Sequence, residues 1–419
     1  MLTETRVVLR NVGKINPVSV EDYRSNGGYE SLRMALSMSS ADIIAEMKRS
    51  GLRGRGGAGF PLWKKWDFVL SAKGEQKYVI CNADEGEPGT NKDRVILSGD
   101  PHSVLEGMAI AAYTVGADTG FLYLRYEYPY LFPILEQAIE NARRMGYLGK
   151  NILGSNFCFD VKVVSGGGAY VCGEETALIE SIEGRRGEPR FKPPYPGTYG
   201  LYGKPTLVNN VETLANVPVI LQRGGDWFKS IGAPHCTGTK VFTLCGNIAQ
   251  KGVFEYPMGT NLRDILEAHG GVKDNKDLLG FMLGGQSGNL INAGQIDLPM
   301  DIDSCQQAES VLGTGTIMVI DDCNDILDIV ENIMSFFIEE SCGKCTPCRE
   351  GNIRILEILR RIHSGQGRMD DLELLEDLAS TMNVACLCGL GQNSSVAVIT
   401  SLHNFRDVYQ KAIQRGRSA

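Results

Sequence analysis

The chain contains the stretch Cys342-Gly-Lys-Cys345-Thr-Pro-Cys348, in which two residues separate each cysteine from the next. Three thiolates at this spacing can bind three corners of a cubane while a distant cysteine completes it, which indicates an iron–sulfur cluster. Zinc is the alternative, although structural zinc usually takes two separated cysteine pairs. One loop supplies three ligands, so the fourth must come from elsewhere in the same region. From spacing alone, Cys386 and Cys388 are both candidates.

The sequence around these cysteines, from residue 325 onward, has the periodicity of helices. Apolar residues recur at i, i+3, i+4 and i+7, which predicts amphipathic helices. The stretches are 326–337, 355–362, 372–382 and 399–409. Four such helices predict a four-helix bundle that carries the cysteines.

The preceding sequence divides into two further parts. Before residue 236, strand-like runs alternate with longer helical patterns, which predicts an α/β layer structure. The strand-like runs are 78–81, 121–125 and 159–165, and the helical ones are 103–115 and 131–144. In the next part, strand-like runs at 240–244 and 317–320 flank a helical stretch at 262–269, which predicts a small α+β module. We therefore expect domains at 1–236, 237–324 and 325–419.

Composition limits the class of protein. The chain has 419 residues, 43% hydrophobic and 22% charged, as in ordinary globular proteins. Its net charge of −8 argues against nucleic acid as a partner. No apolar run is long enough to insert in a membrane, and the N-terminal residues lack an apolar signal core, so we expect a cytoplasmic protein.

In that compartment the 12 cysteines are better interpreted as thiols or metal ligands than as disulfides. Seven of them lack ligand spacing, and we expect each to be a small buried hydrophobe. These are Cys81, Cys158, Cys172, Cys236, Cys245, Cys305 and Cys323.

Three glycine- or asparagine-containing turns are candidate nucleotide-binding elements. Residues 54–59 read GRGGAG and match G-x-G-x-x-G, but they follow a helical pattern instead of a strand. Two rings and a cation, Phe60, Phe68 and Lys65, follow, which suits a nucleotide; a flexible glycine loop is the alternative.

Residues 166–168, all glycine, stand between a strand pattern and a helical stretch at 174–182, an arrangement that binds phosphate. Asn209 and Asn210 follow a third apolar run and either contact a ligand or cap the next helix.

Five carboxylates accompany these turns: Asp84, Glu85, Glu87, Glu174 and Glu175. Carboxylates accept hydrogen bonds from ribose hydroxyls and repel a 2′-phosphate, which favours NAD over NADP. A solvated acidic turn is the alternative for any one of them.

Five long segments together resemble one known family. They are GLRGRGGAGFP (51–61), CNADEGEPGTNKDR (81–94), GAYVCGEETALIESIEG (168–184), KPPYPGTYGLYGKPTLVNNVET (192–213) and SCGKCTPCREG (341–351). The sequence resembles the NADH-binding flavoprotein subunit of complex I and its relatives in soluble NAD-linked hydrogenases and formate dehydrogenases. The resemblance implies a Rossmann-like FMN and NADH domain, a ubiquitin-like β-grasp domain and a C-terminal bundle with one 4Fe–4S cluster. It also implies oxidation of NADH, or the reverse, with hydride transfer by FMN and no catalytic side chain.

The resemblance also implies site residues. For FMN they are Gly54, Gly56, Lys65, Asn82, Asp84, Gly173, Asn209, Asn210 and Thr213. For NADH they are Phe60, Phe68, Glu87, Glu174, Glu175, Lys192 and Tyr195, with Glu87 and Glu175 orienting the hydride transfer. The cluster ligands are Cys342, Cys345, Cys348 and Cys388, the last because the family's fourth cysteine precedes x-Leu-Gly. Cys386 then has no implied role.

The C-terminal residues are similar to one branch of the family. Gln392, with Phe405 and Tyr409 after it, looks more like the flavoprotein subunit of NADH-dependent or bifurcating iron-only hydrogenases than like complex I. That resemblance implies a thioredoxin-like 2Fe–2S subunit and a larger iron–sulfur or hydrogenase subunit as partners. The extra cluster domains of many such relatives are not found in this sequence. Complex I, formate dehydrogenase and a zinc-bearing nucleotide-binding scaffold are the alternatives.

Overall fold

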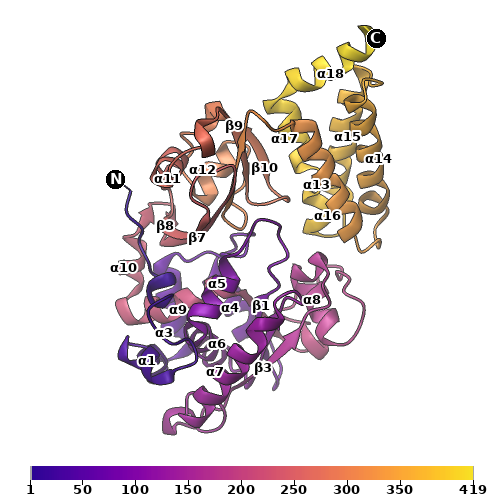
Figure 1. Ribbon diagram of the computed structural model, residues 1–419. Coiled ribbons are helices and arrows are strands. Elements are labelled where there is room, and N and C mark those ends of the chain that lie inside the picture. Colours follow the sequence, from indigo (N-terminus) through magenta and orange to yellow (C-terminus); the bar gives the residue numbers. More distant parts are fainter. Residues whose placement is uncertain (1, 419) are drawn as a thin grey trace.

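The structure is a computed structural model that describes residues 2–418, with side chains as far as residue 415. Figure 1 shows an α/β part in indigo to magenta, a mixed sheet with short helices in salmon, and a group of helices in orange to yellow. They follow one another along the chain.

The first part is built on a parallel sheet in the order β3-β2-β1-β4. Its strands are β1 (Tyr78–Ala83), β2 (Thr119–Leu124), β3 (Asp160–Ser165) and β4 (Thr206–Asn210). Both faces of its central strand are buried: Val79 and Cys81 lie in one apolar cluster and Ile80 in another. This two-sided burial is typical of parallel strands covered by helices. The Rossmann-like α/β prediction is confirmed in this coarse form.

The helices of this part lie mainly before and between the strands. They are α1 (Val20–Ser25), α2 (Glu30–Ala35), α3 (Ser40–Ser50), α4 (Leu62–Ser71), α5 (Lys92–Gly99), α6 (Pro101–Val115), α7 (Phe132–Arg144), α8 (Glu175–Ile182), α9 (Val211–Arg223) and α10 (Gly225–Lys229). Helix α6 is almost wholly buried. A Cβ at Gly107 would lie 2.2 Å from the Leu214 carbonyl oxygen, so glycine lets α6 and α9 meet backbone to backbone.

The strand order creates a crevice at one edge of this sheet. β1 pairs with β2 on one side and with β4 on the other, so the chain order reverses at β1. In open α/β sheets, ligands bind beyond the carboxyl ends of the strands at such a point. Here those ends carry Asn82 on β1 and Asn210 on β4, paired in register.

The second part contains a five-stranded sheet in the order β10-β9-β11-β7-β8. Its strands are β7 (Thr239–Gly246), β8 (Gly252–Pro257), β9 (Leu278–Leu283), β10 (Asn289–Asn292) and β11 (Thr316–Asp321), with helices α11 (Leu262–Ala268) and α12 (Ile302–Gln307). A two-stranded ribbon, β5 (Gly232–Ala233) and β6 (Cys236–Thr237), precedes it. β11 and β7 are parallel and the other pairs antiparallel. The predicted α+β module is confirmed; β8, β9, β10 and α12 were not predicted.

The last part is helical, as predicted, but with more helices than expected. They are α13 (Ile326–Glu340), α14 (Thr346–His363), α15 (Asp370–Ala385), α16 (Gly389–Asn393), α17 (Val396–Asn404) and α18 (Arg406–Ser418). The single helix predicted over 399–409 is wrong, because the chain leaves helical geometry at Phe405. Phe405 and Tyr409 remain buried on both sides of this break, which is why the apolar spacing looked continuous.

None of the 12 cysteines forms a disulfide in the structure. The expectation that the seven cysteines without ligand spacing are buried is wrong for Cys323, which is exposed, and incomplete for Cys158 and Cys245, which are half-buried. Cys323 lies in the turn after β11, where side chains face solvent. None of the helices in residues 2–418 combines the length and hydropathy needed to cross a membrane.

Candidate functional site

A cavity of about 260 Å³ lies at the carboxyl edge of the parallel sheet. Seven of the predicted site residues line it: Gly56, Asn82, Asp84, Glu87, Gly173, Glu174 and Asn210. They come from the carboxyl ends of β1 and β4, the loop after β1, the glycine loop and the turn before α8. The structure thus brings together residues that are far apart in the sequence.

The glycine loop presents bare backbone to this cavity. The Gly54 N–H donates to the Phe60 carbonyl at 2.8 Å, which closes the loop, and the Arg55 N–H donates to Thr213 Oγ1 at 2.8 Å. A Cβ on Gly56 would lie 2.9 Å from the Cβ of Asn210, so any other residue there would press on β4. A backbone free of side chains lets a bulky ligand approach closely.

Buried charges support the floor of the cavity. Lys92 Nζ lies 2.7 Å from Asp93 Oδ1, 3.0 Å from Asn210 Oδ1 and 3.1 Å from Glu212 Oε2. Lys240 Nζ lies 2.6 Å from the same Glu212 oxygen. Burial lowers the pKa of Lys240 to about 8. Burial alone would raise the pKa of Glu212, but the two lysines hold it below its ordinary value. These partners hold Asn210 in place.

Asp84 has an unpartnered acceptor inside the cavity. Its Oδ2 atom is buried and has no hydrogen-bond partner, and burial raises the pKa of this carboxyl to about 7. A buried polar atom without a partner is costly unless a ligand supplies one. A flavin, which offers ring N–H and ribityl hydroxyl donors, fits this oxygen and the bare glycine backbone.

Glu87 is held where the three parts of the chain meet. Tyr170 donates its hydroxyl to Glu87 Oε2 at 2.6 Å, and Ser287 of the second part donates its hydroxyl to the same oxygen at 2.7 Å. The Tyr170 N–H donates to Glu340 of the helical part at 2.8 Å. Burial raises the pKa of Glu87, although these donors oppose the shift.

Three ion pairs between two lysines and two glutamates stand beside the cavity. Lys65 Nζ lies 2.7 Å from Glu175 Oε2, and Lys192 Nζ lies 2.7 Å from Glu174 Oε1 and 3.7 Å from Glu175 Oε1. Burial opposes ionisation of Glu175, but the two lysines outweigh it and lower its pKa. The other oxygen of Glu174 accepts from the first N–H groups of α8. Glu174 therefore caps α8 and pairs with Lys192, while Glu175 is paired with both lysines.

Three aromatic residues predicted to bind the nucleotide are exposed. Phe60, Phe68 and Tyr195 show 46%, 60% and 60% of their surface. A Cβ on Gly197 would lie 3.9 Å from the Cβ of Phe68, so the turn after Tyr195 lies against α4. Exposed aromatic rings can stack on a nucleotide base.

Some predicted residues act behind the cavity instead of lining it. Asn209 Oδ1 accepts from the Trp66 indole at 3.0 Å, and Thr213 accepts from the glycine loop. Glycines 166–168, which the sequence predicts to bind phosphate, do not line this cavity. A short 3₁₀ turn, η4 (Tyr170–Gly173), separates them from α8, and Glu174 already occupies the helix N-terminus.

Other lining residues were missed. They include Thr90, Lys92, Asp93, Tyr170, Ser287, Thr314, Gly389, Leu390 and Asn393. Lys92, Asp93 and Tyr170 lie within the quoted segments and could have been found there. Ser287, Thr314 and Asn393 come from the second and third parts, and no local pattern marks them.

The cysteines form a second, smaller cavity next to the first. Cys342, Cys345, Cys348 and Cys388 line it, and Cys386 does not. Ser341 Oγ and Cys348 Sγ lie 3.2 Å apart, and Asn352 Nδ2 donates to Cys348 Sγ at 3.5 Å. Cys388 stands at the N-terminus of α16. Four thiols around one small space, with donors on the sulfurs, suit a cubane cluster.

The two cavities share part of their walls. Val171 and Leu390 line both, and Cys388 is followed directly by Gly389 and Leu390 in the lining of the larger cavity. One layer of side chains therefore separates the place for a flavin from the place for a cluster. Figure 1 shows the corresponding arrangement, with α16 at the end of the bundle that faces the α/β part.

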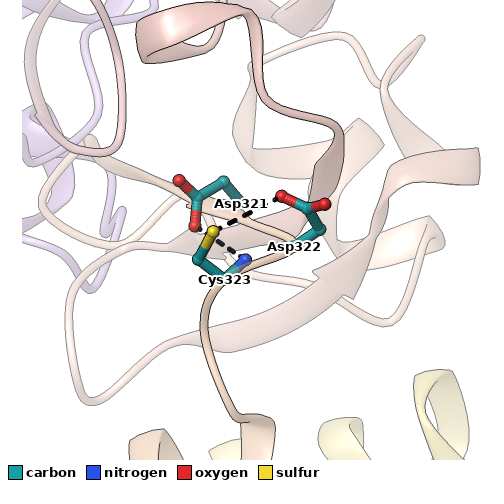
Figure 2. A group of neighbouring side chains, drawn as sticks. All are labelled: Asp321, Asp322 and Cys323. Atoms are coloured by element: carbon teal, nitrogen blue, oxygen red, sulfur yellow. Dashed lines mark hydrogen bonds between the residues drawn. The ribbon is translucent and has the colours of Figure 1, made fainter.

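A further group of possible metal-binding side chains lies elsewhere. Figure 2 shows Asp321, Asp322 and Cys323 in the turn after β11. The Cys323 N–H donates to Asp321 Oδ1 at 3.2 Å, so these residues are occupied in shaping the turn. The two that follow Asp321 are exposed.

Comparison with known proteins identifies the chain. Residues 47–219 match the Nuo51 FMN-binding domain, residues 241–288 the SLBB domain, and residues 328–412 the NADH-ubiquinone oxidoreductase-F iron-sulfur binding region. NADP-reducing hydrogenase subunit HndC of Solidesulfovibrio fructosivorans is 46% identical over 97% of this chain and 83% of its own length. The chain belongs to the family of NADH dehydrogenase flavoprotein subunits. An NADH-quinone oxidoreductase subunit of Rhizobium meliloti (strain 1021), at 46% identity over 98% of both chains, is another relative.

Solved structures of NAD⁺-reducing NiFe-hydrogenase agree with this membership. The H₂-reduced state matches with a TM-score of 0.82 at 39% identity, over 90% of this chain and 64% of that one. The air-oxidised state matches with a TM-score of 0.85 at 36% identity, over 99% and 68%. The chain thus spans about two thirds of those hydrogenase chains. As a member of the family it is an FMN-, NADH- and 4Fe–4S-binding oxidoreductase module, which favours iron–sulfur over zinc.

Proposed function

We propose that this flavoprotein exchanges electrons between NADH and the iron–sulfur partner subunits of a soluble hydrogenase. The observation that carries the proposal is the shared wall of the two cavities, at Val171 and Leu390. When bound, FMN supplies the conversion between two-electron hydride chemistry and single-electron transfer. The chain's own residues bind, orient and shield the cofactors.

The geometry supports specific assignments for the flavin. Asp84 Oδ2 is an acceptor in need of a donor, Gly56 and Gly173 leave backbone exposed, and Asn82 and Asn210 close the sides. Three residues that do not line the cavity support it through hydrogen bonds to neighbouring residues: Gly54, Asn209 and Thr213. Lys65 is paired with Glu175 beside the cavity.

For the nucleotide, we assign the exposed rings Phe60, Phe68 and Tyr195 to the base and ribose, with Lys192 and the Glu174–Glu175 pair beside them. Glu87, buried and held by two hydroxyl donors, stands on the flavin side and orients the reacting end. The hydride step needs no acid or base from the protein. The protein contributes by excluding water and by fixing the orientation of the nicotinamide against the flavin.

For the cluster, we assign Cys342, Cys345, Cys348 and Cys388. These four line the small cavity together, and Cys386 stays outside it. We propose domain limits at residues 236 and 324 and a β-grasp fold for the middle domain, which the parallel β11–β7 pair flanked by antiparallel strands supports.

Two relatives that are each 46% identical belong to different assemblies, because one is a hydrogenase subunit and the other a quinone oxidoreductase subunit. The solved hydrogenase chains and the residues from Gln392 to Tyr409 favour the hydrogenase. The partners we propose are a thioredoxin-like 2Fe–2S subunit and a larger subunit with the hydrogen-forming site, in the cytoplasm where NADH is available. One of the two relatives is named an NADP-reducing hydrogenase subunit. The use of NADH and not NADPH by this chain is therefore part of the proposal.

Purification of the native complex tests this assignment. We expect hydrogen-dependent reduction of NAD by a complex that contains a hydrogenase subunit. Quinone reductase activity in membranes, with no hydrogenase subunit bound, would contradict the hydrogenase assignment and indicate complex I instead.

A further inference from the structure

A lysine of the middle sheet lies beneath the larger cavity without lining it. Lys240 lies on β7, and its side chain is 1% exposed. Its Nζ atom lies 2.6 Å from Glu212 Oε2 of α9, and the same oxygen lies 3.1 Å from Nζ of Lys92. Lys92 lines the cavity. Two contacts therefore connect a charge of the middle part of the chain to the wall of the flavin site.

The neighbouring strand leaves space for the ammonium group of Lys240. A Cβ on Gly315 would lie 2.8 Å from Cε and 2.9 Å from Nζ of this lysine. Gly315 stands directly before β11, the parallel neighbour of β7. Lys240 Nζ also donates to the Val241 carbonyl at 2.6 Å. The position of the ammonium group is therefore fixed by Glu212 on one side and by the sheet on the other.

The contact between β7 and α9 does not require the lysine side chain. The backbone N–H of Val241 donates to Glu212 Oε1 at 2.9 Å. Desolvation offsets much of the attraction within a buried ion pair, so such a pair adds little stability over apolar side chains of similar size. What Lys240 adds at this position is therefore mainly its positive charge.

The charges around the cavity make that positive charge important. Of the described residues that line the cavity, five are acidic and only Lys92 is basic. Lys92 is shared between Asp93, at 2.7 Å, and Glu212. Burial lowers the pKa of Lys240 to about 8, so this lysine is mostly charged at pH 7. Lys92 and Lys240 then balance Asp93 and Glu212, whereas without Lys240 one negative charge would be left beneath the cavity.

Reduction adds negative charge to a flavin, and protein charges near the ring change its reduction potential. Salt screens buried charges much less than exposed ones. We propose that Lys240 is a positioning residue that acts through Glu212 and Lys92 to raise the reduction potential of the bound flavin. The inference rests on the proposed place of the flavin. It gives the middle sheet a part in electron transfer that is separate from its contribution to the cavity wall.

The test is an anaerobic titration of the FMN-loaded full chain with dithionite at pH 7, in which the midpoint potential is read from the flavin absorption band against a reference dye. Lys240→Met removes the charge and should lower the ratio of reduced to oxidised flavin at a fixed potential about tenfold, which corresponds to ~30 mV for two electrons. Lys240→Gln is also neutral but keeps a hydrogen-bond donor for Glu212, and it should lower the potential in the same direction. It replaces Lys240→Met in the comparison if the methionine variant does not hold the flavin.

Two further variants separate charge from packing. Lys240→Met combined with Glu212→Gln removes one charge of each sign, so its potential should return toward that of the parent. Lys77→Met is a matched control, because Lys77 is a buried lysine that stands directly before β1, at the amino end of the parallel sheet. Its Nζ donates to the carbonyls of Val69 and Leu70, each at 2.8 Å, and Lys77→Met should leave the potential unchanged.

The direction of each shift decides between the two roles. An unchanged or raised potential in either neutral variant of Lys240 overturns the proposal. So does an equal lowering in the double variant, because the shift would then come from lost packing between β7 and α9. A parent chain whose flavin is reduced by dithionite but not by NADH would instead refute the proposed function and leave the comparison of potentials intact.

Discussion

Asp84 is the single residue whose chemistry depends most on the ligand. Its buried carboxyl has a pKa raised to about 7 by burial, so it is largely protonated at pH 6 and ionised at pH 8. Only the carboxylate can accept from flavin donors at both oxygens. We therefore predict that the affinity of the flavin-free chain for FMN rises with pH up to about 7, by at most about tenfold per pH unit, and then levels off.

Fluorescence quenching on titration with FMN measures this dependence. Asp84→Asn should bind more weakly at pH 8 and lose the slope. Riboflavin should show the same slope as FMN in the parent, which separates Asp84 from ionisation of the phosphate. An identical slope in Asp84→Asn would show that Asp84 does not face the flavin.

Glu175 is the residue we expect to select the nucleotide. It is paired with Lys65 beside the cavity, whereas Glu174 caps α8 with one oxygen and pairs with Lys192 through the other. Glu175→Gln removes the charge that repels a 2′-phosphate and should raise the NADPH-to-NADH ratio of kcat/KM by about tenfold, equivalent to ~1.4 kcal/mol.

Ferricyanide reduction with each nucleotide gives this ratio. Glu136→Gln, an exposed change on α7, serves as the control and should leave the ratio unchanged. A ratio that stays constant in Glu175→Gln would remove this carboxylate from the ribose site.

At the scale of elements, the loop between β9 and β10 brings the middle part of the chain into the site. Ser287 of that loop donates to Glu87 through its hydroxyl at 2.7 Å and its N–H at 3.1 Å. Ser287→Ala removes the first of these hydrogen bonds, worth about 1 kcal/mol. We predict a severalfold higher KM for NADH with a smaller change in kcat, because Glu87 loses one restraint but keeps the hydroxyl donor of Tyr170.

Steady-state kinetics with an artificial acceptor measure the two constants separately. Ser310→Ala is a matched control, because Ser310 is a buried serine of the same part whose hydroxyl has no partner. Equal kinetics for Ser287→Ala and Ser310→Ala would refute a role for this loop in the site.

Elements determined by local sequence could be predicted, whereas features that depend on contacts between distant residues could not. Strands β1, β2 and β3 and the long helices were visible in local periodicity, and Cys342, Cys345 and Cys348 in spacing. The break at Phe405 was not visible, because burial of Phe405 and Tyr409 preserves helical spacing across it. Ser287 and Asn393 enter the cavity only through tertiary packing, so no window of sequence could reveal them. The Glu174 side chain caps α8 behind glycines 166–168, and the strand–glycine–helix pattern did not reveal this cap.

At the scale of the whole molecule, three parts of the chain converge on one path. The parallel sheet supplies the flavin cavity, the middle sheet contributes Ser287 and Thr314 to its wall, and the helical part contributes Leu390 and Asn393. The cluster cavity lies directly behind that wall. This arrangement fits a path in which NADH reduces the cluster through a flavin held in the same chain.

An anaerobic titration of the cofactor-loaded chain with NADH, followed by both visible absorption and EPR, tests that claim most directly. We predict that NADH bleaches the flavin band and produces the signal of a reduced 4Fe–4S cluster, while Cys388→Ser shows the bleaching without the signal. If NADH bleaches the flavin but leaves a dithionite-reducible cluster oxidised in the parent chain, the cluster is not on the path and the account is wrong.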